Sequence, residues 1–133
     1  MRNLVTILVG VLFSVLVSAH EGHDHTPGSV NAPHGGVIQG TDSLYWELVT
    51  EAGGITLYPL THELASISVK EISLNGEVTM PKKKKGEPVK FEGASDHFTA
   101  KIDSKGAYHY SLGLSFSYKG KKEKVKFQVE PLN

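Results

Sequence analysis

The sequence predicts an all-β protein, an immunoglobulin-like antiparallel β-sandwich, and two observations support this. From residue 34 onward, short apolar or alternating runs are interrupted by Gly, Pro and Asn at close intervals, as in domains built from many short strands. No window has the longer periodicity of an amphipathic helix. We expect strands at residues 36–39, 44–50, 55–59, 66–74, 77–80, 89–92, 97–103, 108–119 and 122–130.

The last two predicted strands form the clearest hairpin. Every second residue of 108–118 is aromatic or Leu, so one face should pack in the core and the other should meet water. Lys119-Gly120 is expected to form the turn. Asn75-Gly76 is expected to form a second tight turn, because both of its residues accept positive φ angles. Two sheets packed face to face account for this pattern, and a small closed barrel is the alternative.

Residues 1–19 have the features of a cleaved signal peptide. Arg2 supplies a positive charge, an apolar stretch covers residues 4–17, and Val17-Ser18-Ala19 offers small residues for cleavage. The apolar stretch is shorter than the roughly 20 residues that cross a bilayer. The absence of cysteine excludes disulfides, thiolate metal sites and a lipid-modified N-terminal cysteine. We therefore expect a soluble periplasmic protein without a stable membrane anchor, beginning at His20.

Charge is distributed unevenly along the mature chain. Residues 20–69 contain six carboxylates and neither Lys nor Arg, whereas residues 70–133 contain 13 lysines and eight carboxylates, a balance of +5. The whole chain is neutral, which, together with the expected compartment, argues against nucleic acid as a partner. The four lysines at 82–85 are expected to form a solvated loop, with anionic lipid or an acidic partner as the alternative.

Residues 20–33 are expected to form a flexible, His-rich, metal-binding tail ahead of a β-sandwich domain at 34–133. The tail has almost no large apolar residue to bury, so it cannot offset the entropy of ordering. Its imidazoles and carboxylates suit a divalent transition metal, with Cu(II) or Zn(II) favoured. Because imidazoles bind metal only when deprotonated, affinity should fall below about pH 6. The candidate ligands are His20, His23, Asp24 and His25.

The four other histidines are weaker candidates as ligands. Paired glycines after His34 would let it turn toward the tail or toward Glu47 on the next strand. His62 reads as a loop residue facing solvent. Asp96-His97 begins a strand and is similar to the Asp-x-His element of secreted copper-resistance sandwiches, although the spacing differs. His109 should point to solvent.

Three motifs resemble the small N-terminal metal-associated domain of periplasmic adaptors in heavy-metal efflux systems. They are the leader at 20–25, Pro33-His34-Gly35-Gly36-Val37, and the pair Tyr45-Trp46-Glu47-Leu48-Val49 and Ile55-Thr56-Leu57-Tyr58. The resemblance implies a periplasmic β-sandwich that handles Cu, Zn, Co or Ni ions, with His34 and Glu47 as further ligands and an efflux complex as a candidate partner. The chain lacks the helical hairpin of an adaptor, which leaves binding, buffering or delivery of ions.

No catalytic signature accompanies these motifs, so the sequence favours a protein that is not an enzyme. There is no Gly-x-Ser-x-Gly elbow, no phosphate-binding loop and no His-Glu-x-x-His helix. The alternative function is a structural or protein-interaction module of the cell envelope that binds no metal. Copper oxidase chemistry at an N-terminal histidine is the remaining enzymatic reading.

Overall fold

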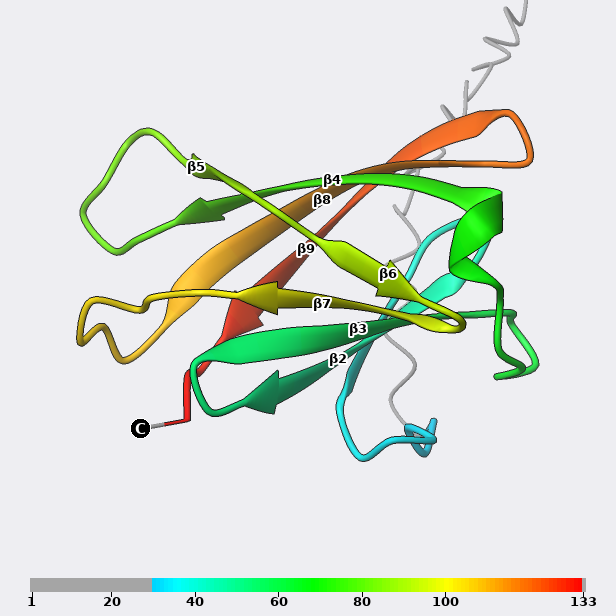
Figure 1. Ribbon diagram of the computed structural model, residues 1–133, viewed down its shortest axis with the longest axis horizontal. Coiled ribbons are helices and arrows are strands. Elements are labelled where there is room, and N and C mark those ends of the chain that lie inside the picture. Colours follow the sequence, from blue (N-terminus) through cyan, green and yellow to red (C-terminus); the bar gives the residue numbers. More distant parts are fainter. Residues whose placement is uncertain (1–29, 133) are drawn as a thin grey trace, which may run out of the picture.

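The computed structural model describes residues 30–132 as two antiparallel sheets packed against each other (Figure 1). One sheet has the strand order β1-β2-β3-β7-β6 and the other β5-β4-β8-β9. A single turn of 3-10 helix, Val69–Glu71, precedes β4. The strands are β1 (Val37–Gly40), β2 (Tyr45–Glu51), β3 (Gly54–Leu60), β4 (Ile72–Thr79), β5 (Glu87–Val89), β6 (Glu92–Ala94), β7 (His97–Lys101), β8 (Tyr110–Tyr118) and β9 (Lys121–Val129).

This strand order confirms the predicted immunoglobulin-like sandwich. β2-β3-β7-β6 corresponds to the A-B-E-D sheet of that fold, and β4-β8-β9 to its C-F-G sheet. β5 adds a strand beside β4, and β1 extends the other sheet beside β2. The chain therefore forms two separate sheets instead of a closed barrel.

The core lies between the sheets and is built by side chains that alternate along the strands. Tyr110, Leu112, Leu114 and Phe116 of β8 are all buried, as the alternation predicts. Trp46 of β2 is fully buried and packs edge-on against Phe116 at 5.3 Å between ring centroids. Together these contacts join the two sheets around one hydrophobic core.

Tyr108 departs from the predicted alternation. It was expected in the strand that carries the core aromatics, but β8 begins at Tyr110 and Tyr108 is 87 % exposed on the preceding loop. The predicted turn at Lys119-Gly120 is confirmed, because it joins β8 to β9 with φ angles of 49° and 78°.

The predicted turn at Asn75-Gly76 is wrong. Both residues lie inside β4, where Asn75 pairs with Ser115 and Gly76 with Leu114 of β8. Gly76 serves a packing purpose here: a Cβ at this position would lie 2.7 Å from Cζ of Phe91. The glycine therefore makes room for an aromatic ring from a neighbouring segment instead of turning the chain.

The strand predicted at 89–92 is also wrong, because the chain changes sheets there. β5 ends at Val89 in one sheet and β6 begins at Glu92 in the other. Between them, Phe91 packs at 6.4 Å from the ring of Phe98 and against the core. The run packs against the core through Phe91, but the chain crosses there from one sheet to the other.

The predicted signal peptide and most of the His-rich tail lie outside the described residues. Within 30–132, no helix is long and apolar enough to cross a membrane.

Candidate metal centre

His34 lies on a short turn that precedes β1, and the two glycines after it fix its position. Gly35 has a φ of 74°, a conformation that side chains with a Cβ rarely adopt, and its N–H donates to the carbonyl of Ala32 at 3.1 Å. Gly36 lies so close to the carbonyl of Leu48 that a Cβ would overlap it. The glycine pair thus bends the segment and lays it against β2.

The Glu47 carboxylate, on β2, holds this segment in place. It is fully buried and accepts hydrogen bonds at Oε1 from the backbone N–H groups of His34 (2.8 Å) and Gly36 (2.9 Å). Its Oε2 lies 2.8 Å from Nδ1 of His34. Because an ionised carboxylate only accepts hydrogen bonds, Nδ1 carries the proton and Nε2 of a neutral ring keeps its lone pair.

Tyr58 of β3 is the next residue across the sheet. It pairs with Glu47 in the strand register, and its ring stacks on His34 with 3.6 Å between centroids and 5° between planes. Burial, followed by the nearby charge of Asp96 and then of Glu51 and Glu47, raises the pKa of the Tyr58 phenol. The phenol is therefore neutral, and its ring packs face to face against the imidazole.

His97, the first residue of β7, lies beside the same tyrosine. Leu57 pairs with Phe98, so the neighbouring positions Tyr58 and His97 come side by side, with 5.6 Å between ring centroids. Nδ1 of His97 lies 2.9 Å from Oδ1 of Asp96. That hydrogen bond is the main reason why the pKa of Asp96 is lowered, and His34 adds a smaller effect.

The two histidines therefore share one arrangement. In each, Nδ1 is occupied by a carboxylate, the ring packs on Tyr58, and the side chain is 32 % exposed. A carboxylate on one ring nitrogen is the usual way in which proteins orient a histidine whose other nitrogen binds metal. Within residues 30–132, however, no group of three or more His, Cys, Asp or Glu side chains is placed to hold an ion.

The remaining candidates lie elsewhere or outside the described residues. His20, His23, Asp24 and His25 fall in the undescribed part of the chain. His62 is exposed, with Nε2 at 3.0 Å from the carbonyl of Thr41. His109 is exposed on the loop before β8, on a different part of the surface from Tyr58.

The sequence predicts that His34 can meet Glu47, but it does not predict that His97, Asp96 and Tyr58 lie beside them. Their proximity depends on the register of three strands that are not all consecutive in the chain. The available signal was the Asp96-His97 pair at the start of a strand, because a carboxylate beside an imidazole can fix its orientation.

Comparisons of the chain with models of protein families, with curated proteins and with solved structures found no match.

Proposed function

We propose that this protein binds divalent transition-metal ions in the periplasm, and buffers or delivers them in association with heavy-metal efflux or resistance. The observation that carries the proposal is the pair of carboxylate-oriented imidazoles, His34 and His97, that both pack on Tyr58. The likeness of its motifs to the metal-associated domain of efflux adaptors supports the same reading.

In this proposal the imidazole Nε2 atoms are the ligands and the carboxylates orient them. Both oxygens of Glu47 already accept hydrogen bonds, so its role is to fix the ring of His34 instead of binding the ion directly. Asp96 has the same role for His97. Imidazole nitrogen suits Cu(II) and Zn(II), which are the favoured ions.

The remaining ligands would come from the N-terminal histidines. His25 is nine positions before His34, and a chain of that length spans at most roughly 30 Å, so His20, His23 and His25 are within reach of the pair. A site completed by the tail histidines would bind an ion without having all of its ligands in place beforehand. Such a site suits exchange of ions with a partner better than permanent storage.

Calorimetric titration of the exported protein with Cu(II), Zn(II), Ni(II) and Co(II) tests the proposal. We expect a dissociation constant below about 10 µM for at least one ion, within the range of metal sensors. His34→Ala and His97→Ala should each weaken binding at least about tenfold, and a chain that starts at Pro33 should also bind more weakly. His109→Ala is the matched control and should change nothing. If no ion binds at this level, the chain is an interaction module instead.

A further inference from the structure

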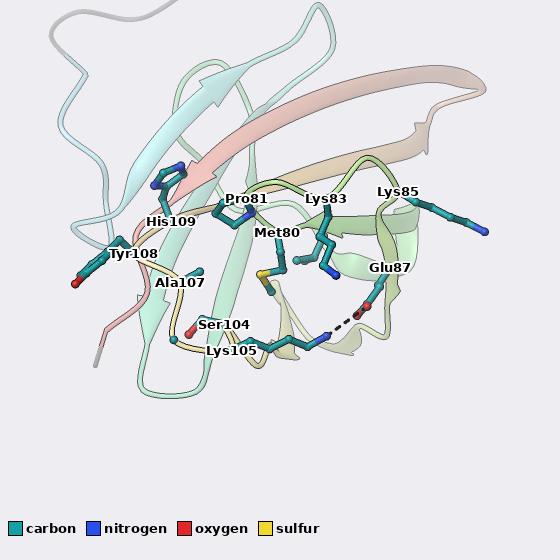
Figure 2. A pocket seen from close by; sticks show the side chains of 12 residues that line it. Met80, Pro81, Lys83, Lys85, Glu87, Ser104, Lys105, Ala107, Tyr108 and His109 are labelled. Atoms are coloured by element: carbon teal, nitrogen blue, oxygen red, sulfur yellow. Dashed lines mark hydrogen bonds and ion pairs between the residues drawn. The ribbon is translucent and has the colours of Figure 1, made fainter.

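A cleft opens at one end of the sandwich, between the β4–β5 loop (residues 80–86) and the β7–β8 loop (residues 102–109). In Figure 1 these loops lie together at the end opposite the β8–β9 turn. The cleft has a volume of about 460 Å³ and an apolar floor formed by Val78, Met80, Pro81 and Ala107. Figure 2 shows Met80 and Lys83 reaching into it from one loop and Lys105 crossing it from the other.

The two loops carry an excess of positive charge. The excess comes from four consecutive lysines at 82–85 in the β4–β5 loop, because Lys105 and Asp103 balance each other in the β7–β8 loop. Lys105 pairs with Glu87 at 3.4 Å, whereas none of the four lysines forms an ion pair within residues 30–132. Lys83 therefore brings an uncompensated charge into the cleft.

The backbone of both loops is bent at a lysine. Lys82 and Lys105 have φ angles of 63° and 52°, a region where glycine or asparagine is less strained. Lysine therefore occupies positions in both loops that glycine or asparagine would stabilise better.

Tyr108 gives this end an apolar element beside the charge. Its ring is 87 % exposed and points away from the domain in Figure 2, on the same loop as Lys105. Exposed tyrosines beside lysines suit the boundary between water and lipid, where the ring lies at the level of the head groups.

We propose that this end of the sandwich docks reversibly on an anionic phospholipid surface. The lysines at 82–85 contact the head groups, and the ring of Tyr108 enters the interface. An acidic peptide fits less well, because Lys83 and Lys85 extend in different directions in Figure 2 and reach separate anions more easily than one strand of carboxylates.

The test measures partition of the full exported protein onto vesicles of phosphatidylglycerol mixed with phosphatidylcholine, by sedimentation at low salt. Replacing Lys83, Lys84 and Lys85 by Gln should weaken partition about 100-fold, since each lysine near an anionic surface contributes roughly fivefold. The matched control replaces Lys122, Lys124 and Lys126 by Gln, which removes the same charge from exposed positions on β9. It should weaken partition far less.

A second measurement follows the aromatic contact. Tyr108→Trp should show a blue shift of fluorescence on the anionic vesicles, against the constant signal of the buried Trp46. Tyr108→Ser should weaken partition severalfold. Equal losses in both lysine triples, no partition onto anionic vesicles, or tighter binding to soluble polyglutamate would each overturn the proposal. Metal binding should be the same in all these variants, so failure here leaves the proposed function intact.

Discussion

Glu47 shows how one side chain organises the candidate site. A fully buried carboxylate is costly unless its oxygens are satisfied, and here three hydrogen bonds from His34 and Gly36 satisfy it. The same bonds tie the segment before β1 to the sheet and select the Nδ1-protonated tautomer of His34. Glu47 is thus important both to the fold and to the orientation of the imidazole.

Glu47→Ala should lower the free energy of unfolding by about 2–4 kcal/mol, because it leaves two partly buried backbone N–H groups without an acceptor. Urea denaturation measures this loss. The exposed Glu63→Ala is the control and should stay within about 0.5 kcal/mol of the wild type. Equal stability of the two variants would show that the hydrogen bonds of Glu47 contribute nothing.

For single residues, the sequence predicted contacts between neighbouring segments and missed contacts between strands that are far apart in the chain. His34 and Glu47 could be paired because the glycine pair after His34 frees the backbone just before β1, and Glu47 lies on the next strand. His97 and Tyr58 could not, because β7 joins β3 only after the chain has visited the other sheet. Alternation tells which face a side chain occupies, but it does not tell which strand lies beside it.

Among the elements, alternation predicted most strands, but residues 66–71, predicted as part of a strand, precede β4 and end in the 3-10 helix, and the turn at Gly76 is wrong. The β8–β9 hairpin is confirmed because period-two patterning and the turn residues agree. The prediction at Gly76 is wrong because a glycine between two apolar runs can either form a turn or leave space for a neighbouring side chain. Only the position of Phe91 distinguishes the two cases. The same ring explains why the run at 89–92 divides between two sheets.

Gly76→Ala should therefore destabilise the protein by about 1–3 kcal/mol, since the new methyl group would force the ring of Phe91 to move. Gly113→Ala, on β8, is the matched control: its nearest atom would be the carbonyl oxygen of Glu77 at 3.9 Å, so it should be neutral or slightly stabilising. Thermal unfolding of both variants gives the comparison. A neutral Gly76→Ala, or a cost that persists after Phe91→Ala, would refute this packing role.

Across the whole molecule, the division of charge along the chain becomes a partial division in space. The segment with no Lys or Arg forms β1, β2 and β3, which lie together in one sheet and contribute Glu47 and Tyr58. The lysine-rich segment forms all of the other sheet and also β6 and β7, which complete the first sheet and carry His97. A cation that binds at His34 would thus approach strands without Lys or Arg, while the lysine loops lie at a separate end (Figure 1).

The central claim is that Nε2 of His34 and Nε2 of His97 bind the metal while Glu47 and Asp96 hold the opposite ring nitrogens. Nitrogen NMR of the histidine side chains during Zn(II) titration of the exported protein tests it most directly. We expect both Nε2 signals to shift on metal binding while both Nδ1 atoms stay protonated. Unchanged Nε2 signals for His34 and His97, with any shifts confined to His62 and His109, would contradict it.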